Sequence, residues 1–269
     1  LFQQELGSLR PQEAFYLQQR LADFILTVSP AVYPKSKSFK VHYDFIHSIL
    51  KTSQESLDKA LTNLTEKDRD FIIKKTPVIL NELAKSFIIT GNDSISDHDI
   101  SNYFLLLKQV DMTALLHGYS TLLQLWNQDW LYRFSATVDD MELIDSKIEG
   151  ITGSIYFSAE TDMGLFIIAG KGDNTYTKDI SFLLDLGGND TYRNNAGGYT
   201  KNNAINVLID LQGDDMYSST YDYSQGSGFL GYGILIDIQG DDLYRSLRTS
   251  QGVGFFGYGA IIDWDGDDS

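Results

Sequence analysis

The chain has 269 residues, no cysteine and a formal net charge of −16. Without cysteine it can form neither a disulfide, a thiolate nucleophile nor a cysteine-ligated zinc site. The acidic balance argues against a nucleic-acid partner, because binding to a phosphate backbone needs Lys and Arg to displace counterions. No run approaches the length of about 18 apolar residues that a transmembrane segment requires. We therefore expect cations as partners, no nucleic acid and no transmembrane segment.

The composition changes near residue 150. Residues 1–150 carry 15 Lys and Arg against 20 Asp and Glu, whereas residues 151–269 carry 6 against 17. All 4 prolines precede this boundary, and 19 of the 23 glycines follow it. This change predicts two regions: a helical cap or docking domain over 1–150 and a Gly/Asp/Tyr-rich β-repeat domain over 151–269. The chain stops at "DGDDS", inside a repeated motif, so we expect the repeat domain to be truncated at its C-terminus.

The first region has the pattern of α-helices. Apolar residues recur at helical spacing over 11–28, directly after a proline suited to a first helical turn. Later helix starts are predicted from three short patterns: Thr76 followed by Pro77, Ser96 paired with Asp99, and Asp111. The sequence therefore predicts an all-α N-terminal domain.

This region also contains every histidine of the chain: His42, His47, His98 and His117. None pairs at the three- or four-residue spacing that would place two metal ligands on one helix face, so we expect structural roles for them. The local motifs of zinc proteases, serine hydrolases and P-loop proteins are missing as well.

The second region repeats. Its units align as "FIIAGKGDNTY" from Phe166, "FLLDLGGNDTY" from Phe182, "VLIDLQGDDMY" from Val207, "ILIDIQGDDLY" from Ile234 and "AIIDWDGDDS" from Ala260. From the second unit onward, each apolar run ends in an aspartate, and these recur at a nearly constant spacing as Asp185, Asp210, Asp237 and Asp263. A second block, "SQGSGFLGYG" from Ser224, returns in the next unit as "SQGVGFFGYG" from Ser250.

A repeat of about 26 residues fits one coil of a solenoid. At about 3.3 Å per residue, 26 residues span about 85 Å, enough for two or three short strands and their turns. We therefore predict a C-terminal parallel β-helix (β-solenoid) with repeats of about 26 residues, in which stacked units bury a common core. The alternative is an antiparallel β meander or barrel with two long strands per unit.

In a solenoid, the acidic residues of successive units form columns. Two carboxylates about 4.8 Å apart repel by about 3.5 kcal/mol at an effective dielectric of 20, so a column needs compensation. Calcium would provide it, because it accepts about six to eight oxygen ligands. Alternatively, each aspartate bonds backbone N–H groups in an Asx-turn and stays solvated. The candidate calcium ligands are Asp185, Asp190, Asp210, Asp214, Asp215, Asp237, Asp241, Asp242, Asp263, Asp267 and Asp268.

The stretch "LGGNDTY" at 186–192 resembles the Gly- and Asp-rich repeats of RTX calcium-binding proteins, which are exported bacterial β-rolls. RTX repeats are tandem nonapeptides, whereas the units of this chain are much longer and lack the contiguous glycine pattern. The resemblance implies calcium ligation at Asp190, Asp215, Asp242 and Asp268, and an exported protein.

Each turn is followed by a tyrosine, and Tyr192, Tyr217 and Tyr244 repeat in step with the aspartates. They predict a stacked aromatic ladder, which either binds a glycan on an exposed face or rigidifies the strand edges.

These features lead to a functional hypothesis. We expect an exported, periplasmic, cell-surface or extracellular structural or binding protein, with a calcium-stabilised solenoid whose face binds a protein or glycan. The alternative is a calcium-dependent polysaccharide-active enzyme, because β-helix proteins of the pectate-lyase kind also combine acidic side chains with calcium.

Overall fold

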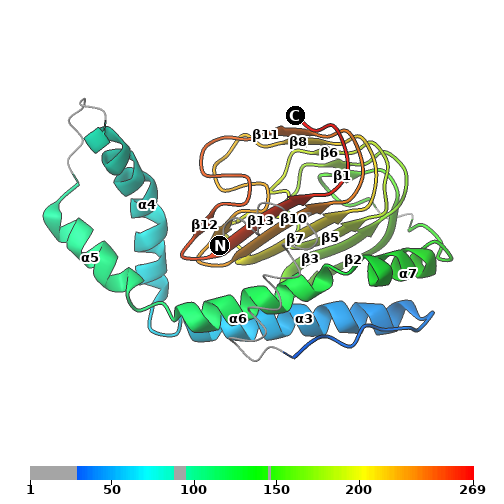
Figure 1. The fold of residues 1–269 in the computed structure, drawn as a ribbon, viewed down its shortest axis with the longest axis horizontal. Helices are drawn as coiled ribbons and strands as arrows, with labels where there is room; N and C mark the ends of the chain where they lie inside the picture. The colour runs from blue at the N-terminus through cyan, green and yellow to red at the C-terminus, as the bar shows by residue number, and fades with distance from the viewer. Residues whose placement is uncertain (1–28, 88–94, 145–146) are drawn as a thin grey trace, which may run out of the picture.

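The structure, a computed structural model, describes residues 29–87, 95–144 and 147–269. Within these ranges a helical region is followed by a parallel β-solenoid of about three turns (Figure 1). The predicted helix over 11–28 lies outside the described residues, so it stays a prediction.

The helices of the described region are α3 (Phe39–Ala60), α4 (Glu66–Phe87), α5 (Asp97–Leu107), α6 (Met112–Leu122), the short 3₁₀ helix η1 (Leu123–Leu125) and α7 (Gln128–Val138). None of these described helices is long and apolar enough to cross a membrane. Two predicted caps are confirmed: Ser96 Oγ accepts from Asp99 N at 3.1 Å, and Asp111 Oδ1 accepts from Thr113 N at 3.0 Å.

The helix start predicted at Thr76 and Pro77 is wrong, because Pro77 lies inside α4. The helix begins directly after Thr65, where Thr65 N donates to Asp68 Oδ2 (2.9 Å) and Asp68 N donates to Thr65 Oγ1 (3.2 Å). This reciprocal pair is a capping box that the sequence interpretation missed. Buried side chains on both sides of the proline hold the helix together despite the lost backbone bond.

The strands form three ladders along the solenoid. The six-stranded sheet has the order β13-β10-β7-β5-β3-β2, the five-stranded sheet β1-β4-β6-β8-β11, and the short third sheet β12-β9. All pairs are parallel except those of β1 and β2, which pair antiparallel with β4 and β3. The bounds of the strands are β1 (Ile151–Thr152), β2 (Ile155–Thr161), β3 (Gly164–Ala169), β4 (Thr175–Tyr176), β5 (Phe182–Asp185), β6 (Thr191–Tyr192), β7 (Ile205–Asp210), β8 (Met216–Ser218), β9 (Gly228–Phe229), β10 (Tyr232–Asp237), β11 (Leu243–Arg245), β12 (Gly254–Phe255) and β13 (Tyr258–Asp263).

The register confirms the predicted repeat. Val207 pairs with Phe182 and with Ile234, and Ile234 pairs with Ala260, as the sequence alignment requires. The antiparallel meander is therefore excluded for these units, and the parallel β-solenoid is the observed fold.

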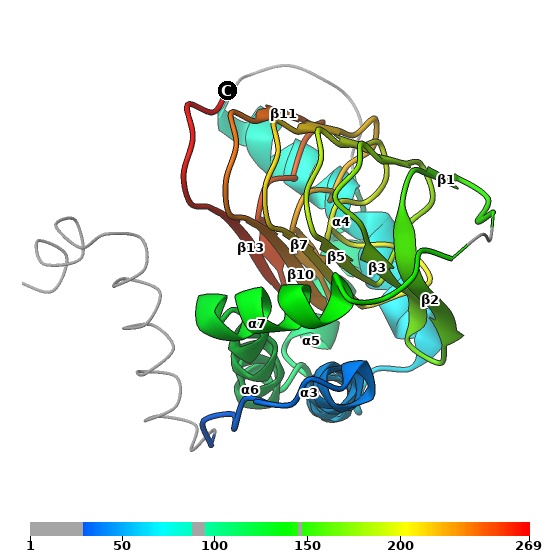
Figure 2. The same ribbon diagram turned by 90° about the vertical axis from the view of Figure 1, so that its right-hand side faces the viewer.

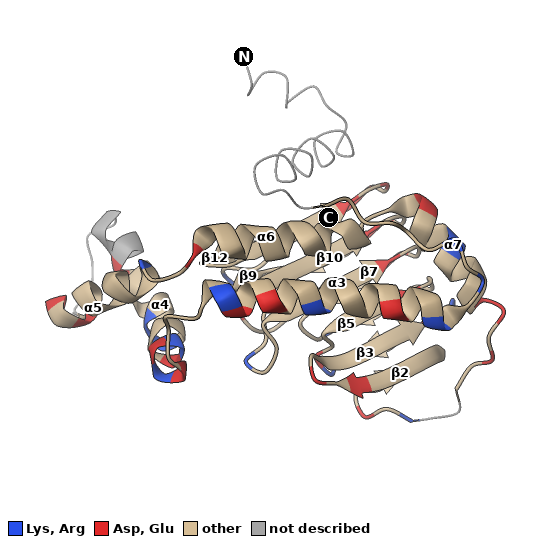
Figure 3. Cartoon of the chain, turned by 90° about the horizontal axis from the view of Figure 1, so that it is seen from below, with Lys and Arg blue, Asp and Glu red and all other residues tan. Residues whose placement is uncertain are grey.

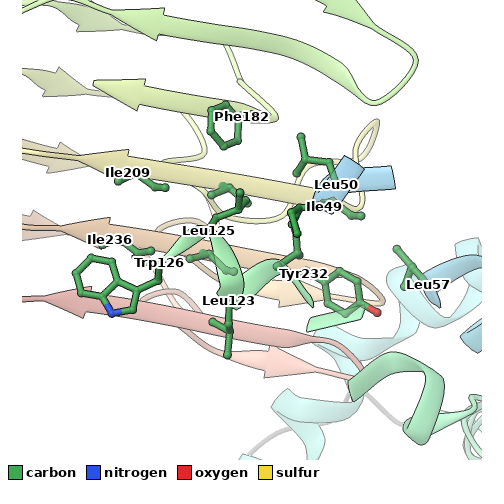
Figure 4. Packing of buried hydrophobic residues seen from close by; sticks show 14 of the residues in the cluster. Ile49, Leu50, Leu57, Leu123, Leu125, Trp126, Phe182, Ile209, Tyr232 and Ile236 are labelled. Carbon is green, nitrogen blue, oxygen red and sulfur yellow. The ribbon is translucent and has the colours of Figure 1, made fainter. Parts of the chain in front are cut away.

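The six-stranded sheet is covered on both faces. Helices α3, α6 and α7 lie against its outer face, whereas its inner face closes the solenoid interior (Figures 2 and 3). Leu57 of α3, Leu125 of η1 and the following Trp126 share one hydrophobic cluster with Ile209 and Ile236 of the strands (Figure 4). The helical region therefore covers a long side of the solenoid.

A second, smaller cluster fills the interior. It contains Leu183, Leu208 and Leu235, which alternate along the strands with residues that face the helices. The aspartates at 185, 210 and 237 follow these leucines by two positions, so the period of two directs them inward as well. The fold thus places a carboxylate column inside a hydrophobic solenoid.

Candidate cation site in the solenoid interior

The inner acidic column consists of the aspartates that end the strands of the six-stranded sheet. Asp185 pairs with Asp210, Asp210 with Asp237, and Asp237 with Asp263 across the parallel ladders. The first three are fully buried, and Asp263 is half-buried on the last strand. The predicted column is therefore present.

The tyrosines form a stacked ladder next to this column. The rings of Tyr176, Tyr192, Tyr217 and Tyr244 are stacked with successive centroid distances of 5.0, 4.7 and 4.8 Å. The stacked ladder was predicted with two alternative roles, and glycan binding on an exposed face is excluded because Tyr176, Tyr192 and Tyr217 are completely buried.

Each phenol donates to an aspartate that lies further along the chain. Tyr217 Oη donates to Asp237 Oδ2 at 2.5 Å and Tyr244 Oη to Asp263 Oδ2 at 2.6 Å. The two preceding tyrosines bond to Asp185 and Asp210 in the same way. The interior is thus a ladder of alternating phenols and carboxyls, and the sequence showed only their common spacing.

The second acidic column lies at the turns and links consecutive coils. Asp190 N donates to Asp215 Oδ1 at 2.6 Å, Asp215 N to Asp242 Oδ1 at 2.7 Å, and Asp242 N to Asp268 Oδ1 at 3.0 Å. Asp190, Asp215 and Asp242 are buried, whereas Asp268 is exposed. One oxygen of each carboxylate therefore has a backbone partner.

The third column lies on the outside of the turns. Asp214, Asp241 and Asp267 are all exposed. Backbone N–H groups in this column bond to the side chain one coil earlier, as Asp241 N does to Asp214 Oδ1 at 3.1 Å. This is the solvated backbone-bonded arrangement weighed as the alternative to calcium. The structure does not bring these three residues into the interior clusters.

The two inner columns together form three groups of carboxylates whose nearest oxygens lie within 4.8 Å of one another. The groups are Asp185–Asp190–Asp210, Asp215–Asp237–Asp242 and Asp242–Asp263–Asp268. Two oxygens on opposite sides of a calcium ion lie about 4.6–5.2 Å apart, since each Ca–O bond measures about 2.3–2.6 Å. These groups can therefore hold a metal ion of that size.

The first two groups differ in how their oxygens are satisfied. In the first group, Asp185 accepts from Tyr176 and from Gly187 N, and Asp210 accepts from Tyr192 and from Gln212 N. The second group has three buried oxygens without a hydrogen-bond partner: Asp215 Oδ2, Asp237 Oδ1 and Asp242 Oδ2. A buried acceptor without a partner carries a desolvation cost that either a proton on one carboxyl or a bound cation removes, so this group is the stronger candidate for a cation site.

The electrostatics of the site lead to the same conclusion. Burial, followed by the neighbouring Asp242 carboxylate, raises the pKa of Asp237 to about 9. Burial raises the pKa of Asp215 to about 7 and that of Asp242 to about 6. At neutral pH such a group either keeps a proton or binds a cation, because an uncompensated buried charge is unstable.

His42, one of the four histidines, has the structural role expected of it. The buried ring of His42 bonds to Ser36 O through Nε2 at 2.8 Å and accepts from Trp130 Nε1 at 3.0 Å. Lys171, a basic residue of the repeat region, forms an ion pair with Asp139 at 2.6 Å.

No family model matches the chain, and neither does any curated protein or solved structure. The RTX resemblance at 186–192 therefore gains no support from a family match. A β-solenoid with stacked, buried aspartate clusters is what the structure establishes.

Proposed function

We propose that the protein is an exported structural or binding protein whose β-solenoid is stabilised by bound calcium. The three unpartnered carboxylate oxygens of Asp215, Asp237 and Asp242 carry this proposal. A cation between them supplies the missing partner of all three oxygens and neutralises most of their charge. The donor set consists of hard oxygen ligands, which calcium prefers.

Export is consistent with this role. Calcium sites of extracellular modules work at about 10⁻⁴–10⁻³ M, a concentration range found outside cells. The chain contains no cysteine, so its stability does not depend on disulfide bonds or on the redox state of its surroundings. The resemblance to exported RTX repeats points in the same direction.

A binding role also needs a free surface. The five-stranded sheet β1-β4-β6-β8-β11 lies on the side of the solenoid away from α3, α6 and α7 (Figure 1). Partly exposed side chains of Thr175, Thr191, Met216 and Leu243 line up along this sheet. We propose this face as the docking surface for a protein or glycan.

The polysaccharide-active alternative receives less support. A substrate must reach a catalytic acid and base, but Asp185, Asp210 and Asp237 lie completely inside the solenoid. The outer acids Asp214 and Asp241 repeat from turn to turn, and the backbone N–H of each donates to the side chain one coil earlier, which suits a scaffold better than a unique catalytic constellation.

Thermal unfolding with and without calcium tests the proposal. Protein refolded from urea in millimolar calcium should melt at a higher temperature than protein refolded in EDTA, because a ligand that binds only the folded state stabilises it. Native mass spectrometry of the calcium-loaded sample should show at least one retained ion. Identical melting curves and no retained ion would refute calcium stabilisation.

A further inference from the structure

We propose that the cation at Asp215–Asp237–Asp242 is locked inside the solenoid: it enters as the coils assemble and leaves only when they open. This inference rests on the proposed function and adds how ion exchange is controlled.

The burial of the ligands is the first reason. Asp237 is 0 % exposed, Asp242 2 % and Asp215 3 %, so no ligand of this group is accessible from solvent. A surface calcium site keeps part of its coordination sphere in water and exchanges its ion through that side. Because all three ligands are buried, no part of this coordination sphere faces water.

The turns that cover the group are the second reason. A Cβ atom added at Gly240 would overlap Gly213 O, so the two turns touch through their backbones. Gly213 N donates to Gln239 O at 2.8 Å, and Leu243 N donates to Asp215 O at 2.9 Å, on either side of the acids. An ion cannot pass between these turns while the backbone bonds are intact.

The tyrosine ladder closes the interior side. The rings of Tyr217 and Tyr244 stack at 4.8 Å with an interplanar angle of 2°, and Tyr217 bonds directly to Asp237. Leu208 and Leu235 fill the interior next to these rings. Aromatic and apolar side chains therefore cover the interior side of the site, and exchange through that side requires separation of neighbouring coils.

Local opening of this kind has a measurable consequence. When release requires opening of the structure, its rate follows the opening rate and rises with denaturant. Native states of small domains persist for up to days in water, so a locked ion should withstand a chelator for hours. An exchangeable ion would be lost as soon as the chelator is mixed in.

Terbium, an oxygen-seeking ion whose luminescence nearby tyrosines sensitise, provides the probe. The full chain is refolded from urea in terbium, desalted and mixed with excess EDTA at increasing urea concentrations. Luminescence reports release, and near-UV circular dichroism reports unfolding. We expect release to take hours without urea and to accelerate as urea rises, and metal-free folded protein to take up terbium equally slowly.

Two variants sharpen the test. Leu208→Val removes one buried methylene without touching an acid and should speed release and unfolding together, by up to about fourfold. Asp241→Asn changes an outer acid next to the site and should alter neither rate. Complete release during mixing, with the circular dichroism unchanged, would overturn the locked site.

The possible failures are distinguishable. Rapid release together with a calcium-dependent rise in melting temperature overturns the locked site and leaves the proposed function standing. Failure to retain terbium together with melting curves that calcium does not change overturns both.

Discussion

The substitution Asp237→Asn should have opposite effects with and without calcium. In the wild-type protein, Asp237 Oδ2 accepts from Tyr217, while Oδ1 lacks a partner and belongs to the same group as the unpartnered oxygens of Asp215 and Asp242. An asparagine keeps the acceptor for Tyr217. Its amide N–H group can donate to one of the orphaned carboxylate oxygens, and unlike the Asp237 carboxyl it needs no proton to be neutral.

The size of the effect follows from these changes. Without metal at neutral pH, the wild-type protein must protonate Asp237 as it folds, whereas asparagine needs no proton, so the variant should be more stable by at least about 1–3 kcal/mol. With calcium at about one hundred times its dissociation constant, the wild type gains about 2.7 kcal/mol, whereas the variant should gain almost nothing. At about 2–4 °C per kcal/mol, calcium should raise the wild-type melting temperature by roughly 5–11 °C.

The assay compares melting temperatures of three proteins in EDTA and in calcium. Asp241→Asn serves as the matched control, since it makes the same chemical change nearby in the chain at an outer site. It should behave like the wild type in both conditions. An equal calcium-induced rise in wild type and Asp237→Asn would show that the ion does not bind at this group.

Three further predictions concern the same interior. Because the pKa of Asp237 is higher in the folded than in the unfolded state, its proton-linked stability is complete below about pH 4 and is lost as the pH rises towards about 9. Urea unfolding of metal-free protein should thus show a loss of about 1.4 kcal/mol per pH unit for each such proton between about pH 5 and 8; a flat or rising profile would contradict the buried acids. Tyr217→Phe should cost about 1–3 kcal/mol in urea unfolding, because it leaves an Asp237 oxygen unpartnered while keeping the ring stack, whereas Tyr132→Phe at an exposed position should cost almost nothing. Gly240→Ala should destabilise the protein by roughly 3 kcal/mol or more, since the φ of Gly240 is +153° and an added Cβ would overlap Gly213 O. Gly172→Ala is the control, because the added Cβ would contact only the movable Ser154 side chain; equal melting temperatures of the two variants would contradict close stacking of the turns.

The repeat spacing was sufficient to predict the solenoid and its columns. The nearly constant interval between the strand-ending aspartates aligns them, and the parallel register reproduces this alignment from Asp185 to Asp263. The spacing determines which residues stack, because the coils repeat. It does not determine whether a column faces water or the interior.

The repeat spacing alone does not predict whether a column of aspartates faces solvent or the interior. Asp241 and Asp242 are adjacent and repeat equally well, yet Asp241 is exposed and Asp242 is buried. The apolar run before each aspartate contained a usable signal: "FLLD" and "ILID" are apolar on both faces of the strand, the pattern of a sheet covered on both sides. The helices α3, α6 and α7 provide that second cover.

The helix start at α4 was misjudged for a local reason. Proline favours the first turn of a helix, so the sequence pattern predicts a start at Pro77, but the Thr65–Asp68 capping box lies several turns before it. Tertiary packing of the residues around the proline outweighed its local preference.

Anomalous diffraction from crystals of protein refolded in calcium tests the central claim most directly. The account predicts an anomalous peak between Asp215 Oδ2, Asp237 Oδ1 and Asp242 Oδ2, about 2.3–2.6 Å from each oxygen. No peak at this position, or calcium bound only at the outer Asp214, Asp241 and Asp267, would contradict it.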